Sequence, residues 1–321
     1  MNFVRDNLPL VSVCIPAYNH EKYIVDCLKS VIAQTYQNIE LVIIDDGSSD
    51  GTGTKILGFM PKLQKRFVRV FFESQPNMGT CGTINKLYKN ADGKYIYHIA
   101  SDDMAKPNAI QTLVDFMENN SEYALAVGDN EIIDGNGVHC FWDDNRNNVY
   151  DENIATYKTF GMFLKNVNSD IDFNSDQFGK YSTLVRGNYV PNGYLIRRDI
   201  LNQIGSFTPD APLEDWWFML QISKYAKIKY LDQVLFAYRW HGTNTAKDTI
   251  KMQKMGDKTI QYENRSLKRS SFLGMLPEVK HFIRHEKLRK FIHKYVYHRT
   301  AVGNYIIVKI FGVRVLKYHR K

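Results

Sequence analysis

The chain has 321 residues, of which 44% are hydrophobic and 24% charged, with 20 Gly and 9 Pro. These proportions are ordinary for a globular protein and exclude a collagen-like, disordered or disulfide-scaffold chain. No stretch approaches 18 uninterrupted apolar residues, so we expect neither a membrane-spanning helix nor a signal peptide. The four cysteines lack C-x-x-C spacing, and we expect reduced, packed thiols in a cytoplasmic protein.

The net charge of +8 is concentrated at the C-terminal end. Residues 278–321 contain twelve Lys and Arg against two Glu, a net charge of +10, which leaves about −2 for residues 1–277. Apolar residues at three- and four-residue spacing along 288–296 predict a basic amphipathic helix, and 305–316 predicts a short hairpin around Gly312. This basic tail favours an anionic partner, such as a membrane surface.

The first 130 residues alternate short β-branched runs with helix-length segments, which is typical of a doubly wound, mostly parallel α/β sheet of Rossmann-like type. Strands are expected at 11–15, 40–44, 68–72, 95–99 and 123–127. Helices are expected near 21–34, 52–65, 77–90 and 107–119.

The pattern changes after residue 134. The Asp-Gly-Asn-Gly sequence at 134–137 predicts a hairpin, and the Asn- and Asp-rich segment 143–178 predicts a loop-rich insertion that shapes a pocket. The globular part is then completed by a strand at 189–196, a helix at 215–225 and strands near 228–239.

Three pairs of adjacent carboxylates stand out: Asp45-Asp46, Asp102-Asp103 and Glu214-Asp215. The first two follow predicted strands, at the end where an open α/β sheet binds its ligand. Carboxylates crowded in one cleft repel unless they share a proton or bind a cation, and Mn²⁺ or Mg²⁺ would satisfy them together with a diphosphate ligand. Any single pair is equally well explained as a cap on the helix that follows it.

Several short motifs accompany these pairs in a fixed order across residues 8–245. They are Pro-Ala-Tyr-Asn at 16–19, Asp-Asp-Gly-Ser at 45–48, Asn-x-Gly at 77–79 with Asn85, Ser-Asp-Asp at 101–103, Glu-Asp at 214–215 and Tyr-Arg-Trp-His at 238–241. The ordered set resembles the family-2 glycosyltransferases of the GT-A fold. The resemblance implies a GT-A domain at 1–245, with a nucleotide-sugar-binding half at about 1–130 and an acceptor-binding half at 131–245, and a helical basic C-terminal extension at 246–321.

The resemblance also implies roles for matched residues. The ring of Tyr18 would stack on the base of a nucleotide-sugar, usually UDP-linked, and Asp46 would accept the proton of the base N3. Asp103 would bind the Mn²⁺ or Mg²⁺ that bridges the diphosphate, Asp102 would contact the ribose or a metal-bound water, and His241 is a second candidate metal ligand. The other residues expected to bind the nucleotide-sugar are Pro16, Ala17, Asn19, Asn85 and Arg239.

Asp215 matches the general base of an inverting transfer. In this single in-line displacement the base takes the proton of the acceptor hydroxyl, whose oxygen attacks the anomeric carbon opposite the nucleotide. Glu214, Trp216 and Trp217 are candidate acceptor-binding residues, with core packing expected for at least one of the two indoles.

The resemblance to bacterial members of similar length implies a pathway and a place. The pathway is surface-polysaccharide assembly, of O-antigen or capsule, on a polyprenyl-diphosphate-linked glycan. The place is the inner face of the cytoplasmic membrane, where the enzyme would be peripheral and held by its basic tail.

Two other classes compete with this interpretation. An NAD oxidoreductase would need a G-x-G-x-x-G fingerprint after the first strand, where Pro-Ala-Tyr-Asn stands instead. A nucleic-acid-binding protein with a non-catalytic α/β body would use the basic tail, but its carboxylate clusters would repel phosphates, so we expect no nucleic-acid partner.

Overall fold

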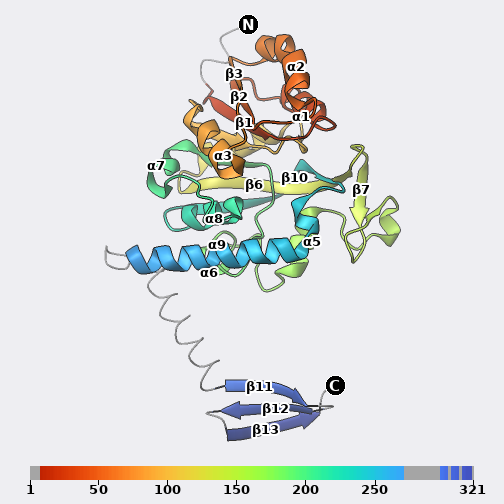
Figure 1. Ribbon diagram of the computed structural model, residues 1–321, viewed down its shortest axis with the longest axis vertical. Helices are drawn as coiled ribbons and strands as arrows, with labels where there is room; N and C mark the ends of the chain where they lie inside the picture. Colours follow the sequence, from red (N-terminus) through yellow and green to blue (C-terminus); the bar gives the residue numbers. More distant parts are fainter. Residues whose placement is uncertain (1–7, 271–296, 303–304, 311–312, 320–321) are drawn as a thin grey trace. The chain divides into compact units, whose positions relative to one another are not determined.

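The computed structural model describes the backbone of residues 8–270, 297–302, 305–310 and 313–319 (Figure 1). The chain divides into two compact units, Met1–Ser266 and Leu267–Lys321. Among the described helices, none combines the length and apolar character that crossing a bilayer requires.

The first unit is built on one mixed sheet with the strand order β3-β2-β1-β4-β9-β6-β10-β5. Its strands are β1 (Val11–Ala17), β2 (Ile39–Asp45), β3 (Arg69–Ser74), β4 (Tyr95–His98), β5 (Met104–Ala105), β6 (Tyr123–Asp134), β9 (Tyr194–Arg197) and β10 (Lys227–Trp240). Strands β3, β2, β1 and β4 run parallel, as do β6 and β10, whereas β9 is antiparallel to both of its neighbours. The doubly wound, mostly parallel sheet is therefore confirmed, and β9 is shorter than the strand expected at 189–196.

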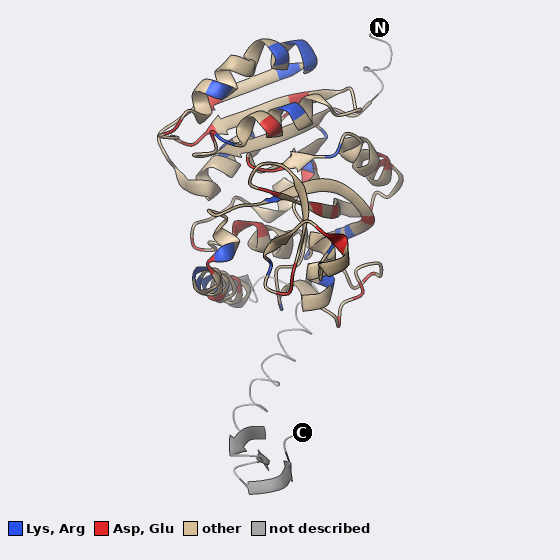
Figure 2. Cartoon of the chain, turned by 90° about the vertical axis from the view of Figure 1, so that its right-hand side faces the viewer, with Lys and Arg blue, Asp and Glu red and all other residues tan. Residues whose placement is uncertain are grey.

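Four helices lie where the sequence predicts them: α1 (Ile24–Ile32), α2 (Thr52–Arg66), α3 (Gly79–Lys89) and α4 (Ala109–Asn119). Helix α1 buries Ile24, Leu28 and Val31, at the spacing of one helical face, against alternate residues of β1 and β2. The main core therefore lies between the sheet and α1, α2 and α4. Figure 2 shows the Lys and Arg residues of α2 in blue at the top of this unit, on its outer side.

The hairpin predicted at 134–137 joins β6 to β7 (His139–Trp142), and Gly137 has the positive φ of +82° that its turn requires. The segment after it is loop-rich, as expected, with the short strand β8 (Asn148–Val149) and the turn η1 (Glu152–Ile154). It also contains helix α5 (Phe160–Val167), which was not expected and whose Phe160 and Phe163 pack on Trp142.

Short elements lead from the insertion to the last helices. They are α6 (Tyr181–Leu184), η2 (Arg198–Ile200), α7 (Leu201–Ile204), α8 (Glu214–Ile222) and η3 (Thr245–Lys247). Helix α9 (Thr249–Ser270) then packs on the first unit through fully buried Thr259 and Glu263. The carboxylate of Glu263 accepts from Tyr181 and Gln221 and lies 2.7 Å from the Lys224 ammonium. The compact unit thus extends to Ser266, beyond the boundary expected at 245.

The second unit contains an antiparallel three-stranded sheet of β11 (Tyr297–Val302), β12 (Tyr305–Ile310) and β13 (Val313–His319). Strands β12 and β13 confirm the hairpin predicted at 305–316. The extension expected as helical at 246–321, apart from that hairpin, contains helix α9 but also strand β11, and β-branched runs such as 306–308 favour the strands of this sheet. The amphipathic helix predicted at 288–296 lies outside the described residues.

Candidate active site

Two of the three predicted carboxylate pairs line one cavity of about 720 Å³ in the first unit. The turn after β4 supplies Asp102 and Asp103, and the first turn of α8 supplies Glu214 and Asp215. Helix α3 forms another wall, and α9 contributes Lys251, Met252 and Met255. The fold therefore assembles a polar cleft at the carboxyl end of β4, as the sequence predicts for an open α/β sheet.

Asp102 lies between two histidines. Its Oδ2 is 3.0 Å from Nε2 of His241 and 3.8 Å from Nε2 of His20. Burial alone would raise the pKa of Asp102, but the His241 hydrogen bond and the electrostatic effects of the two neighbouring imidazoles hold that pKa below its ordinary value. Asp102 is therefore held as a carboxylate.

The orientation of His241 follows from its other ring nitrogen. Its Nδ1 lies 3.3 Å from the backbone nitrogen of Thr243. Because a backbone N–H can only donate, Nδ1 is the acceptor of this hydrogen bond. With Nδ1 accepting, Nε2 carries the proton and donates it to Asp102. In this structure His241 orients Asp102, and as a metal ligand through Nε2 it would have to give up this bond.

Asp103 is almost fully buried, with 1% of its surface exposed. Its Oδ1 accepts a 2.8 Å hydrogen bond from the backbone N–H of Arg239. Burial first, and the neighbouring charge of Asp102 second, raise the pKa of Asp103 well above its ordinary value, against the opposing effect of Arg239. Its Oδ2 has no hydrogen-bond partner among the described residues.

The donor set at this turn fits a hard divalent cation. No group of three ligating side chains is close enough to enclose an ion within the part of the chain that the structure describes. However, Asp103 offers one free oxygen and Asp102 an Oδ1 without a partner among the same residues, and Mn²⁺ or Mg²⁺ takes oxygen ligands and completes its shell from phosphates and water. The repulsion that raises the pKa of Asp103 is what such a cation would relieve.

Arg239 holds the turn rather than facing the cavity. Its Nε donates to the carbonyl oxygen of Asp102 at 2.6 Å, and its Nη2 lies 3.2 Å from the carboxylate of Asp26. Its guanidinium lies over the ring of Tyr23, 5.0 Å from the centroid. Arg239 is 1% exposed, so its contacts are those of a positioning residue.

Sequence reasoning missed His20, Tyr23 and Asp26. The Nδ1 of His20 is 2.7 Å from the hydroxyl of Ser101, next to Asp102. The ring of Tyr23 lies 4.6 Å from that of His241, centroid to centroid. A signal was present for His20, since it follows β1, whose carboxyl end is next to that of β4.

The second pair stands at the start of α8. Asp215 accepts from the side-chain amide of Asn188 at 3.0 Å and from the backbone N–H of Trp216. Burial raises the pKa of Asp215, and burial together with the charge of Asp215 raises the pKa of Glu214. Neither carboxylate forms an ion pair within the described residues, so both are prone to take up a proton.

The two tryptophans that follow are 7% and 6% exposed. The indole N–H of Trp216 donates to the carbonyl oxygen of Leu184 at 2.7 Å, and Trp217 packs near Phe207 and Tyr262. Neither ring lines the cavity. This burial corrects the expectation of a sugar platform: residues 216–222 of α8 are all buried, so both indoles belong to the core.

The residues expected to bind the nucleotide base lie at the ends of β1 and β2. Tyr18 is 49% exposed, with its ring free to stack. Asp46 is buried and its Oδ1 accepts from Gln75 and from the backbone N–H of Met78, which leaves Oδ2 without a partner among the described residues. Pro16 and Ala17 precede Tyr18 at the end of β1.

Two of the expected binding residues have their side chains engaged within the protein. Asn19, with a φ of +51°, accepts from the backbone N–H of Ser49 and so ties the loop after β1 to the loop after β2. Asn85 lines the cavity, but its amide donates to the carbonyl oxygen of Phe207 and accepts from the N–H of the same residue. Both contacts are those of positioning residues.

The comparisons with known proteins agree with this architecture. The model of the family "Glycosyl transferase family 2" matches residues 12–181, more than half of the chain. The chain therefore belongs to glycosyltransferase family 2, and its fold is of the GT-A type.

Its relatives include glycosyltransferase GlyG of Streptococcus pneumoniae, which is 25% identical over 295 residues, 87% of this chain and 90% of that protein. Chondroitin synthase of Escherichia coli is 37% identical over 130 residues, 40% of this chain but 18% of the synthase.

Two solved structures share the fold. Residues 1–349 of S. aureus TarS with UDP-GlcNAc give a TM-score of 0.53 at 20% identity, over 78% of this chain and 66% of that one. The mannosyltransferase PcManGT of Pyrobaculum calidifontis, with GDP-Man and Mn²⁺, gives 0.52 at 12% identity, over 89% and 81%.

Proposed function

We propose that this glycosyltransferase is a metal-dependent, inverting enzyme that moves a sugar from a UDP-sugar to a hydroxyl of a lipid-linked glycan. The observation that carries the proposal is that Asp102-Asp103 and Glu214-Asp215 line the same cavity. The pair Asp102-Asp103 is suited to binding a cation, and the pair Glu214-Asp215 is suited to accepting a proton.

The donor would bind along the carboxyl ends of β1, β2 and β4. Tyr18 offers an exposed ring for the base, Asp46 a free carboxylate oxygen for its N3 proton, and Asp102 and Asp103 oxygens for the cation. The cation would stabilise the negative charge of the leaving diphosphate as a Lewis acid. The complexes of TarS with UDP-GlcNAc and of PcManGT with GDP-Man and Mn²⁺ support this reading of the same fold.

The acceptor would approach the start of α8. Asp215 is held by Asn188 and the Trp216 N–H, and its raised pKa favours proton uptake from an attacking hydroxyl. One general base is enough for a direct displacement, which inverts the anomeric configuration. NMR of the product tests this step: an α-linked donor should give a β-linked product, and retention would refute it.

The acceptor and the location rest on the basic tail. A net charge of +10 over 278–321 would attract the anionic cytoplasmic leaflet, where polyprenyl-diphosphate-linked glycans for O-antigen or capsule are extended. Truncation after Pro277 leaves α9 whole. The truncated enzyme should keep activity on a soluble acceptor and lose salt-sensitive flotation with anionic liposomes; loss of UDP binding instead would make the tail part of the fold.

The reaction itself is tested by screening UDP-sugars and GDP-mannose for nucleotide release with Mn²⁺ and with chelator. Release from one donor that stops in chelator is the expected result. Tight, salt-sensitive oligonucleotide binding without release from any donor would favour the alternative of a nucleic-acid-binding protein.

A further inference from the structure

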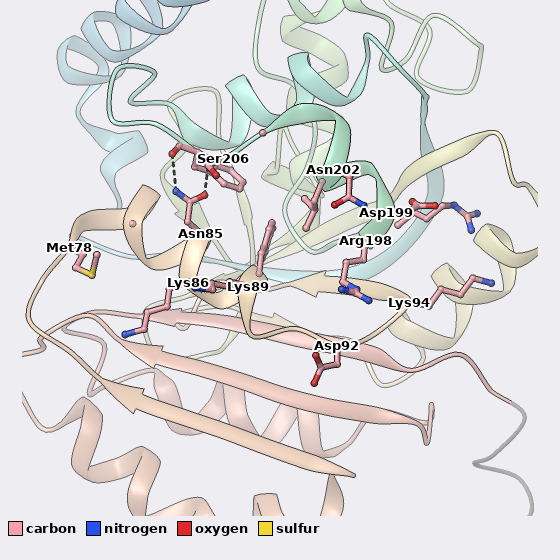
Figure 3. Close-up of a pocket in the computed structure, with 16 residues that line it drawn as sticks. Met78, Asn85, Lys86, Lys89, Asp92, Lys94, Arg198, Asp199, Asn202 and Ser206 are labelled. Carbon is pink, nitrogen blue, oxygen red and sulfur yellow. Dashed lines mark hydrogen bonds between the residues drawn. The ribbon is translucent and has the colours of Figure 1, made fainter.

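A second cavity of about 1190 Å³ lies beside the active-site cavity (Figure 3). One side is formed by the C-terminal half of α3, which supplies Lys86 and Lys89. The other side is formed by residues 197–207, which include Arg198 and Asn202, and the floor by residues 92–94. None of these residues is among those we assign to the donor or to the base.

The lining of this cavity is basic. It contains three lysines and two arginines against two aspartates: Lys86, Lys89, Lys94, Arg197 and Arg198 against Asp92 and Asp199. Two of the lysines are neutralised from outside the cavity, Lys86 by Glu73 and Lys94 by Glu118, each at 2.6 Å. Asp92 is likewise 3.1 Å from Arg69, whose guanidinium does not line the cavity.

Two exposed cations are left without a carboxylate partner among the described residues. Lys89 stands in the last turn of α3 and forms no hydrogen bond there. Arg198 lines the same cavity from the segment after β9, and its Nε donates to the carbonyl oxygen of Gly93 at 2.7 Å. Its two terminal nitrogens have no partner within the part of the chain that the structure describes, and they form the fork that matches a phosphate.

The two cavities share a wall. Met78, Gly82, Asn85 and Phe207 line both, so a ligand can extend from one to the other. The wall is fixed by the paired hydrogen bonds between Asn85 and the backbone of Phe207, drawn in Figure 3. Met78, 60% exposed, and Leu201 add apolar surface to the basic lining.

We propose that this cavity binds the phosphate or diphosphate group at the lipid end of the acceptor, between Lys89 and Arg198. The sugar that carries the reacting hydroxyl would then cross the Asn85 wall to Asp215. The nature of the acceptor rests on the function proposed above, whereas the anion site does not. The reaction that supplies this acceptor must accordingly be one that attaches a sugar to a lipid through phosphate.

The probe is farnesyl diphosphate, a short water-soluble prenyl diphosphate, titrated by calorimetry in the presence of chelator so that no metal holds it in the donor site. We expect binding that farnesol does not reproduce. The double variant Lys89→Glu/Arg198→Glu should bind farnesyl diphosphate at least tenfold more weakly. Each of the two positions loses a charge-assisted contact with the diphosphate and repels it instead. The matched control is Lys62→Glu/Lys65→Glu on exposed α2, with the same change in net charge and wild-type affinity expected.

Lys89→Gln breaks no hydrogen bond within the described residues and should give a smaller loss in the same direction, so a folding defect cannot explain the result. Unchanged affinity in the double variant, or an equal loss in the α2 control, would overturn the proposal.

Inorganic diphosphate that binds as tightly as the prenyl compound would identify a site for free phosphates and overturn the lipid assignment. Anionic vesicles that bind through Lys89 and Arg198 while farnesyl diphosphate does not would assign the cations to headgroups. UDP release from the donor, measured separately, tests the proposed function.

Discussion

The turn at 101–103 and the start of α8 each present two adjacent carboxylates to one cavity, yet their surroundings differ. Asp102 and Asp103 are met by two imidazoles and a backbone N–H from β10. Glu214 and Asp215 are met by a single side-chain amide and the N–H of their own helix. The first environment splits the two pKa values apart, and the second raises both.

This difference separates two kinds of chemistry. At the turn, an ionised carboxylate lies beside one that ionises with difficulty. A cation bound there would stabilise the negative charge of both carboxylates. Two carboxyls that lack cationic partners among the described residues take up a proton more readily than an ordinary carboxyl, as a general base must. Sequence alone, which has two adjacent acids in both places, does not distinguish them.

The largest effect is expected from Asp215→Asn. The amide keeps the hydrogen bond from Trp216 but cannot take the acceptor proton, so the transfer rate should fall by about 10² to 10⁴. Initial rates with a soluble acceptor measure it. Asp210→Asn is the matched control, because Asp210 is exposed and does not line the cavity. A rate above a tenth of wild type in Asp215→Asn, or a large loss in Asp210→Asn, would move the base elsewhere.

The next effect is a shift of the pH profile in Glu214→Gln. Burial and the charge of Asp215 raise the pKa of Glu214 to about 8, so the pair retains a proton in the neutral range and transfer should rise as pH increases through that value. Glutamine removes the competing site, so the rise should move to lower pH in plots of kcat/KM. A profile that stays in place would show that Glu214 is not coupled to the base.

A smaller effect is expected from Thr259→Val on α9. The hydroxyl of Thr259 accepts from the backbone N–H of Leu213, directly before the two acids, at 3.0 Å. Its loss leaves a buried N–H unpaired and should cost about 1 to 3 kcal/mol of unfolding free energy, with a severalfold lower kcat. Thr259→Ser keeps the hydroxyl and should retain kcat. Denaturant titration and kinetics of both variants test whether α9 positions the base.

The parts that sequence predicted well are those set by local pattern. Runs such as 41–44 and 95–97 favour strands, which places the acids that follow them at the carboxyl edge of the sheet. The position of His20 directly after β1 placed it at the carboxyl edge of the sheet, but its approach to Asp102 depended on β1 pairing with β4, which the local pattern does not specify. The bond between Leu213 and Thr259 joins residues 46 positions apart, and the burial of Trp216 and Trp217 depends on the same helix.

The division of labour between the two acid pairs is tested most directly by calorimetric titration of UDP, with and without Mn²⁺. The titration is carried out on Asp103→Asn and Asp215→Asn side by side. Asparagine at 103 keeps an oxygen for the Arg239 N–H but removes the charge that favours the cation, so Mn²⁺-dependent UDP affinity should fall at least tenfold. Asp215→Asn should bind UDP as the wild type does. If Asp103→Asn retains full Mn²⁺-dependent affinity, or if both variants lose it equally, the two acid pairs do not divide metal binding and proton transfer between them.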